Sequence, residues 1–210
     1  MVATLVSEKQ APEPFWPLIL KLRPGLRLTD PVEFYAFCQE HAPWEFERSA
    51  KGELIVKMPT GGESGARNLR LSMYLGIWAL TDGTGVGFDS NTGFEFPDGS
   101  MRAPDAAWVR KSRLAALTPE QKERFLPLVP DFVVELRSRT DRLTELQEKM
   151  QDYADAGVPL GLLLDPQTRR AHLYRPSGAA VVLHDPELVD CSPELTGFIL
   201  AVREIFDATL

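Results

Sequence analysis

The chain has 210 residues, of which 44% are hydrophobic and 25% are charged, and its formal net charge is -7 at pH 7. This length and composition are typical of a globular protein with one sizeable core, and the acidic balance argues against a protein that coats nucleic acid non-specifically, because phosphate binding needs local positive charge. The longest apolar stretch near the start, FWPLIL, is too short to span a bilayer, so we expect a cytoplasmic protein without a membrane segment.

The first third of the chain predicts an arm, a helix and a hairpin. Residues 1–28 are rich in proline and are expected to form an N-terminal arm, and residues 29–210 are expected to form a single domain. A short helix should follow Thr29 or Asp30, which are suitable N-caps. The stretch WEFERSAKGELIVKMP is typical of a hairpin with SAKG as its turn.

A helix and a second hairpin are predicted next. From residue 66 to residue 80 the apolar positions have helical spacing broad enough for a largely buried helix, which Asp82-Gly83 should end. The segments VGFDSNTGFEF and SMRAPDAAWVR are separated by Pro97-Asp98-Gly99, a strong turn signal. Residues 111–129 form a charged segment that should contain helix.

The remaining elements indicate the fold class. The apolar run FVVEL predicts a strand, a helix should span about residues 141–156, and the run LGLLL should return parallel to FVVEL. A last hairpin, AHLYRPSGAAVVL, precedes a tail of mixed character. This order predicts an α/β or α+β fold with a mixed central sheet flanked by helices.

Two acidic residues lie where the sequence predicts strands. Asp105 follows Pro104, which removes a ladder donor and predicts an irregular strand in which a side chain can be re-aimed. Glu135 lies inside FVVEL, where an unpaired buried carboxylate is costly. If the two strands are neighbours, the carboxylates can converge on a hard divalent ion. The alternatives are that Asp105 serves a turn or bulge and that Glu135 pairs with Arg137, Arg139 or Arg142.

Lys149 lies at the margin of the apolar stripe of the helix expected at residues 141–156. At about 100° per residue, it falls roughly 90° from the centre of that stripe. Its ammonium can reach over the end of the sheet toward Glu135, or it can extend outward with its stem on apolar surface. Spacing alone leaves both possibilities open.

The order of these residues resembles a known nuclease signature. Pro104-Asp105 followed by Glu135-Leu136-Arg137 resembles the motif of the PD-(D/E)XK nuclease superfamily. More specifically, the chain is similar to the Uma-two restriction endonuclease family of bacteria. The similarity spans nearly everything beyond residue 28 and rests on FERSAKGELIVKMPTGGESG, FEFPDGSMRAPDAAWVR, PDFVVELRS, LQEKMQDYADAGVPLGLLLDP and ELTGFILAVREIF.

This resemblance implies a restriction-endonuclease-like core with added N- and C-terminal hairpins, and metal-dependent hydrolysis of phosphodiester bonds. Asp105, Glu135 and the backbone carbonyl of Leu136 would hold Mg²⁺ or Mn²⁺. The chain departs from the superfamily pattern at Arg137, which replaces a lysine; arginine can neutralise developing negative charge but is a poor proton acceptor. Lys149, in the family setting EK-x-x-x-Y, is the expected substitute.

A further acid often joins such sites from an early strand or from the first core helix. The candidates are Glu47, in FERSAKGEL, and Glu63, in GGESG, and Glu47 is favoured because it matches a family position after a one-residue insertion. Each has an alternative explanation: Glu63 is favourable near a helix N-terminus by itself, and Glu47 could pair with Arg48. The four tryptophans fall on apolar faces, which favours core packing over base stacking.

Two functions are therefore expected from the sequence. The first is a Mg²⁺-dependent DNA endonuclease that works as a homodimer, because two symmetric sites are the simplest way to cut both strands. The second is a nuclease-like fold that no longer cuts and serves as a binding or assembly module. The acidic pI, Arg137 and the lack of an obvious base-reading element in the sequence favour the second.

Overall fold

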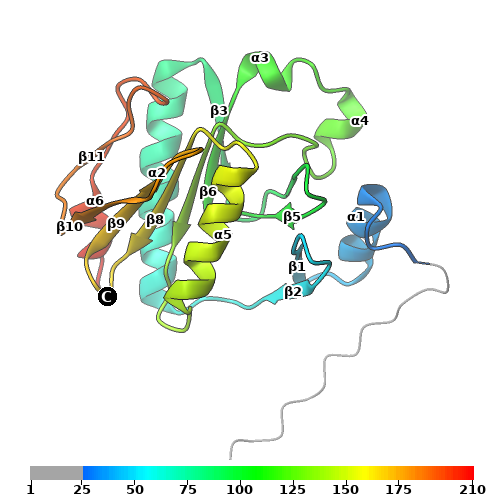
Figure 1. Cartoon of the computed structure of the whole chain (residues 1–210), viewed down its shortest axis with the longest axis horizontal. Coiled ribbons are helices and arrows are strands. Elements are labelled where there is room, and N and C mark those ends of the chain that lie inside the picture. Colours follow the sequence, from blue (N-terminus) through cyan, green and yellow to red (C-terminus); the bar gives the residue numbers. More distant parts are fainter. Residues whose placement is uncertain (1–25) are drawn as a thin grey trace, which may run out of the picture.

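The computed structural model describes residues 26–210, and residues 1–25 of the predicted arm lie outside the described part of the chain (Figure 1). It contains a six-stranded central sheet, a four-stranded sheet and a two-stranded sheet. The predicted mixed central sheet with flanking helices is confirmed. Within residues 26–210, no helix is both long enough and apolar enough to cross a lipid bilayer.

The central sheet has the strand order β10-β9-β8-β7-β6-β3. Its strands are β3 (Gly85–Asp89), β6 (Ala106–Arg110), β7 (Phe132–Leu136), β8 (Leu160–Asp165), β9 (Arg170–Tyr174) and β10 (Val181–His184). The predicted parallel pairing of β7 with β8 is confirmed, and the other neighbouring strands run antiparallel. Every residue of β7 and β8 is buried, as expected of strands covered on both faces.

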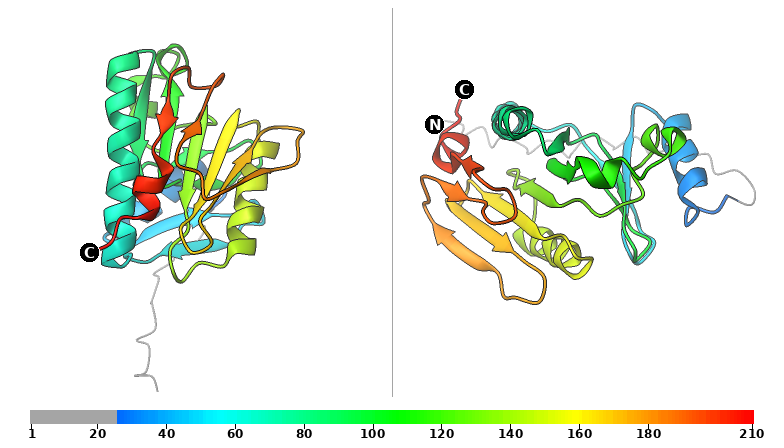
Figure 2. Two further views of the ribbon diagram at one scale, coloured as in Figure 1. Left: turned by 90° about the vertical axis from the view of Figure 1, so that its left-hand side faces the viewer. Right: turned by 90° about the horizontal axis from the view of Figure 1, so that it is seen from above.

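Different helices cover the two faces of this sheet (Figure 2). On one face lie α2 (Gly62–Asp82) and α6 (Val202–Phe206), whose apolar side chains share a core with Val134. On the other face lies α5 (Leu143–Asp155), whose inward side chains share a second core with Val133. Because successive residues of a strand point to opposite faces, each strand residue can be assigned to the α2 side or the α5 side.

The expectation that the helix near residues 66–80 is largely buried is wrong. Leu71, Leu75 and Ala79 are buried against the sheet. The opposite side of α2 is exposed although it is apolar, because no described element covers it. This outer face of α2 consists of Leu69, Met73, Ile77 and Leu80, which are 63%, 53%, 60% and 86% exposed.

The four-stranded sheet has the order β2-β1-β5-β4 and lies beside the central sheet. Its strands are β1 (Glu45–Arg48), β2 (Leu54–Lys57), β4 (Phe94–Glu95) and β5 (Met101–Arg102). The predicted hairpin of residues 44–59 is confirmed as β1 and β2. The helix α1 (Pro31–Glu40) has Asp30 as its N-cap and packs Phe34 and Phe37 against Phe46 of this sheet.

The second predicted hairpin is shared between the two sheets. Its tip has the expected turn, with Gly99 at φ 81° and a 2.9 Å hydrogen bond from the Phe96 amide to the Ser100 carbonyl. The β4 and β5 strands next to the turn join the four-stranded sheet, whereas β3 and β6 join the central sheet. The chain changes sheets between β5 and β6, at Pro104 and Asp105, so the irregular backbone predicted there is confirmed.

The remaining described elements are short. They are α3 (Lys111–Leu114), α4 (Pro119–Lys122), β11 (Val189–Asp190) and β12 (Ile199–Leu200). The first two lie in the segment where a charged, helix-containing excursion was predicted. The last two form the two-stranded sheet that precedes α6.

Candidate active site

Asp105 and Glu135 lie on the same face of the central sheet. Val133 and Ala107 pack in the core on the α5 side, and side chains two positions apart in a strand share a face. Glu135 and Asp105 therefore also point to the α5 side. The antiparallel register of β6 and β7 pairs Ala106 with Val134, so the next position on each strand brings the two acids opposite each other.

A hydrogen bond fixes the position of the Asp105 carboxylate. The backbone amide of Leu136 donates to Asp105 Oδ2 at 2.7 Å. The second oxygen, Oδ1, accepts no hydrogen bond from residues 26–210. Because Pro104 interrupts the strand, Asp105 can turn its carboxylate across the end of β6 instead of continuing the ladder.

Lys149 joins Glu135 to Glu47. Its Nζ atom is 2.8 Å from Glu135 Oε1 and 3.1 Å from Glu47 Oε1. Glu47 comes from β1 of the four-stranded sheet, where Phe46 points into the core with α1 and Glu47 therefore points the other way. Of the two orientations that spacing left open for Lys149, the structure has the inward one.

Three further side chains complete the cluster, and sequence reasoning did not identify them as site residues. Lys57 Nζ lies 3.8 Å from Glu47 Oε1, and Arg102 NH1 lies 3.7 Å from Glu47 Oε2. Tyr153 donates its hydroxyl to Glu135 Oε1 at 2.9 Å, although its spacing predicted only core packing. Lys57 could have been found from the hairpin, because it lies two strand positions from Ile55, the cross-strand partner of Glu47.

The pKa values of the acids follow from their burial and from these cations. Burial raises the pKa of Glu135 to about 7, although Lys149 acts to lower it. Burial also raises the pKa of Asp105. At Glu47 burial acts in the same direction, but Lys149, then Lys57 and Arg102, outweigh it and lower the pKa. Glu47 is therefore held ionised, whereas ionisation of Asp105 and Glu135 is disfavoured until further positive charge arrives.

Lys149 remains a cation in this environment. Burial acts to lower its pKa, but the carboxylates of Glu135 and Glu47 outweigh that effect and raise the pKa above its usual value. Its side chain is only 15% exposed. An ammonium held between two carboxylates can donate hydrogen bonds to an anion, but it is not a proton acceptor.

Two of the sequence candidates lie apart from this cluster. Arg137 pairs with the fully buried Asp165, with 2.9 Å between NH1 and Oδ2. Glu63 is at the start of α2, where its exposed carboxylate pairs with Arg67 at 3.4 Å. None of the contacts within residues 26–210 links Arg137 or Glu63 to Asp105 or Glu135.

The oxygen atoms of the cluster fit a hard divalent cation. Asp105 Oδ1 and Glu135 Oε2 accept no hydrogen bond from the described residues, and the Leu136 carbonyl belongs to the adjacent strand position. Magnesium is commonly held by one or two carboxylates while keeping waters and substrate oxygens as its other ligands. No group of three or more His, Cys, Asp or Glu side chains in residues 26–210 is arranged to hold a metal ion.

The comparisons with known proteins identify the family of the chain. The model of the Uma2 family, described as "Putative restriction endonuclease", matches residues 31–203. A solved structure from Anabaena variabilis ATCC 29413, titled as a "putative nuclease belonging to DUF820", has a similar fold with a TM-score of 0.65. It is 20% identical in sequence, and the match covers 77% of this chain and 89% of that one. No curated protein matches. Because the family model matches most of the chain, the protein belongs to the Uma2 family.

Proposed function

We propose that the protein is a divalent-metal-dependent endonuclease that hydrolyses DNA phosphodiester bonds by a PD-(D/E)XK-type mechanism. The observation that carries the proposal is the meeting of Asp105 and Glu135 on one face of the sheet, with the Lys149 ammonium 2.8 Å from Glu135. Buried acids with raised pKa values next to a buried cation are more common at functional sites than in structural cores. Membership of the family supports a nuclease but does not specify the metal.

In this proposal the two acids and the Leu136 carbonyl hold Mg²⁺ or Mn²⁺. When bound, the ion would polarise the scissile phosphate and lower the pKa of the attacking water. Asp105 is oriented for this role by the Leu136 amide, and Glu135 by the Tyr153 hydroxyl and Lys149. A cation also offsets the cost of ionising two carboxylates that face each other, one buried and one half-buried.

Lys149 is the side chain that stabilises charge on the phosphate. Its ammonium can donate to a phosphate oxygen beside Glu135, where negative charge increases as the water attacks. Glu47 holds Lys149 in place, and Glu135 together with Glu47 keeps it protonated. Arg137 has no part in this step because Asp165 and the Asp141 carbonyl hold its guanidinium.

The alternative function is a binding or assembly module that does not cut. The observation that favours it concerns Arg137. The superfamily signature has a lysine at this position, whereas here an arginine occupies it, pairs with Asp165 and contributes no charge to the cluster. In the endonuclease, Lys149 takes over the role of that lysine; in the binding module, no residue does.

We further propose that two copies associate through the outer face of α2. This face carries Ile77 and Leu80 in exposed positions, and residues 71–81 contain no charged side chain. An exposed apolar helix face without charges is typical of an interface. Sedimentation of the wild type and of Ile77→Glu tests the dimer: the wild type should sediment as a dimer and the variant as a monomer with unchanged helix content. A monomeric wild type would refute it.

Nicking of supercoiled plasmid tests the endonuclease. Purified wild type should convert supercoiled DNA to open-circular or linear form in Mg²⁺ or Mn²⁺ and not in EDTA. Asp105→Asn and Glu135→Gln keep the shape of each side chain and remove its charge, and each should lower the initial rate by about 100-fold or more.

Glu145→Gln is the matched control, because Glu145 is an exposed acid of α5 whose only described ion pair is with Arg142. It should cut at the wild-type rate. Equal nicking by all four proteins would indicate a contaminating nuclease and reject the proposal. Metal binding by the wild type without cleavage would favour the binding module.

A further inference from the structure

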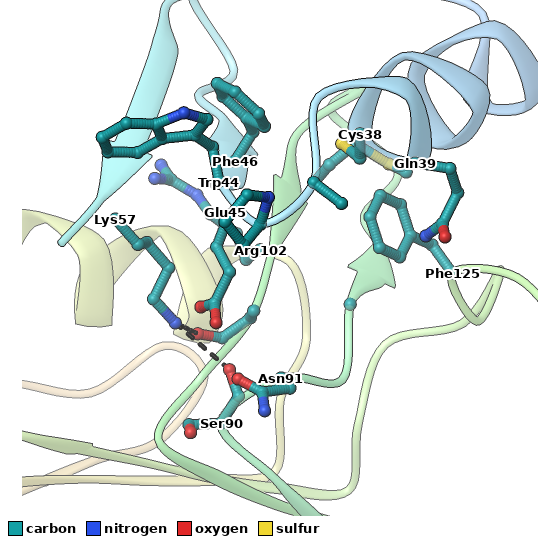
Figure 3. A pocket seen from close by; sticks show the side chains of 15 residues that line it. Cys38, Gln39, Trp44, Glu45, Phe46, Lys57, Ser90, Asn91, Arg102 and Phe125 are labelled. Carbon is teal, nitrogen blue, oxygen red and sulfur yellow. Dashed lines mark hydrogen bonds between the residues drawn. The ribbon is translucent and has the colours of Figure 1, made fainter. Parts of the chain in front are cut away.

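A pocket of about 200 Å³ lies next to the proposed active site (Figure 3). Lys57 and Arg102 line it and also contact Glu47, which binds the catalytic Lys149. The Lys57 ammonium is fixed at the pocket wall by hydrogen bonds of 3.2 Å to the backbone carbonyls of Ser90 and Ala103. A group bound against Lys57 or Arg102 would therefore be linked to Glu135 through Glu47 and then Lys149.

The walls of the pocket combine aromatic rings with hydrogen-bonding groups. Figure 3 shows Trp44 and Phe125 on opposite sides, with the polar groups of Glu45 and Asn91 between and below them. Trp44 is 40% exposed, and none of the ring contacts within the described residues involves it. The prediction that the tryptophans pack in the core is thus wrong for Trp44, while Trp16 lies outside the described residues.

A buried polar atom in the pocket wall lacks a partner. Arg102 is 6% exposed, and its Nε atom makes no hydrogen bond with any described residue. The NH1 and NH2 groups of the same guanidinium contact Glu47 and Asp152. The Arg102 guanidinium therefore lines the pocket as a buried cation that is already paired with two acids.

We propose that this pocket receives one unstacked nucleobase of the DNA substrate, next to the phosphate that is cut. The proposal rests on the endonuclease function and adds the form of DNA that the site takes. Ligand pockets for larger molecules usually measure about 300–1,000 Å³, so a smaller pocket suits a single ring system. Trp44 supplies a face for stacking, and Asn91 and Glu45 supply hydrogen-bonding groups for a base edge.

The substrate preference follows from this pocket. A base inside an intact duplex is stacked and paired, and removing it costs energy that an unpaired base does not require. The protein should therefore bind single-stranded or mismatched DNA more tightly than a fully paired duplex. Supercoiled plasmid, in which negative supercoiling favours local opening, should be cut faster than relaxed plasmid of the same sequence.

Binding measured without metal tests the pocket separately from cleavage. Fluorescence anisotropy in EDTA would follow a labelled single strand, a duplex with one mismatch and a fully paired duplex, with wild type, Trp44→Ala, Trp44→Phe and Ile199→Ala. Trp44→Ala should weaken single-strand binding by about tenfold or more, Trp44→Phe should retain most of it, and duplex binding should change little. Ile199, exposed on β12, is the control and should bind as the wild type does.

The possible outcomes distinguish failure of the base pocket from failure of the endonuclease function. A wild type that nicks plasmid but binds all three DNAs equally, or a Trp44→Ala variant that keeps the single-strand preference, overturns the base pocket and leaves the nuclease intact. Loss of that preference in Trp44→Ala supports the pocket even if no preparation cuts DNA, in which case only the endonuclease function fails. A Trp44→Ala variant with an altered circular dichroism spectrum would make Asn91→Ala the deciding variant, with the same expected loss.

Discussion

Lys149 on α5 and Glu47 on β1 are 102 residues apart in the sequence, yet Lys149 Nζ donates a hydrogen bond to Glu47 Oε1 at 3.1 Å. The same ammonium is 2.8 Å from Glu135 on β7. One lysine thus ties the four-stranded sheet, the central sheet and α5 together at the proposed active site. It is both the cation of the site and a structural link, and its replacement should affect activity and stability.

Replacing Lys149 with methionine should lower both the nicking rate and the stability. The rate should fall by about 100-fold or more, because the variant loses the donor next to the scissile phosphate. The free energy of unfolding should fall by about 3 kcal/mol, because Glu47 and Glu135 lose their shared partner in a buried setting. Initial nicking rates and urea denaturation measure the two effects. Lys149→Arg keeps the charge and should retain more of the stability than of the rate; wild-type cleavage by Lys149→Met would exclude a catalytic role.

Restoring the superfamily lysine at position 137 should not restore cleavage to the Lys149→Met variant. Arg137 is directed to Asp165 and to the backbone of Asp141, so a lysine there would have the same acidic neighbour. The double variant Lys149→Met with Arg137→Lys should therefore cut as slowly as Lys149→Met alone. Recovery of plasmid nicking in the double variant would show that position 137 does reach the phosphate.

Removing the Tyr153 hydroxyl should destabilise the protein by about 1 kcal/mol. The hydroxyl donates to the buried Glu135 carboxylate at 2.9 Å, while the ring packs beside Phe96 with 5.3 Å between centroids. Tyr153→Phe keeps the ring and deletes only the donor. Tyr174→Phe is the matched control, because Tyr174 lies in the same core and its hydroxyl makes no hydrogen bond with residues 26–210. Equal unfolding midpoints for the two variants would contradict a role for the Tyr153 hydrogen bond.

His172 on β9 should make the protein less stable as the pH falls. Burial lowers the pKa of His172 below its ordinary value of 6.5; Asp165 acts to raise it, while Arg170 and His184 act to lower it further. The unfolded chain therefore binds this proton more readily than the folded protein does, so the contribution to stability is present above about pH 6.5 and is lost below it. The free energy of unfolding should therefore fall as the pH is lowered from 7 to 5.

The variant His172→Leu removes this titration, so its free energy of unfolding should depend less on pH over the same interval. Chemical denaturation at several pH values measures the slope. A His172→Leu slope equal to that of the wild type would assign the pH dependence to other groups.

Much of the fold could be predicted because its signals are local. The buried runs at β7 and β8, the turn at Gly99 and the cap at Asp30 depend on residues a few positions apart. The convergence of Asp105 and Glu135 could be anticipated from the sequence, because the order of the strands and the alternation of side chains indicate which residues oppose each other. That Arg137 lies apart from them was harder to predict, because it depends on Asp165 at the carboxyl end of the neighbouring parallel strand β8.

The sequence by itself predicted most of the strands and helices, because periodicity and turn chemistry act between near neighbours. It also indicated that Asp105 and Glu135 would converge if their strands were neighbours. Only the tertiary structure decided the rest. Glu47, Lys57 and Arg102 meet because β1 lies between β2 and β5 in the four-stranded sheet, and Trp44 borders a pocket that is also lined by residues of α1 and of the β3–β4 connection. The outer face of α2 is exposed for a related reason: the helical pattern shows which residues are apolar, but the packing of distant elements decides which of them are covered.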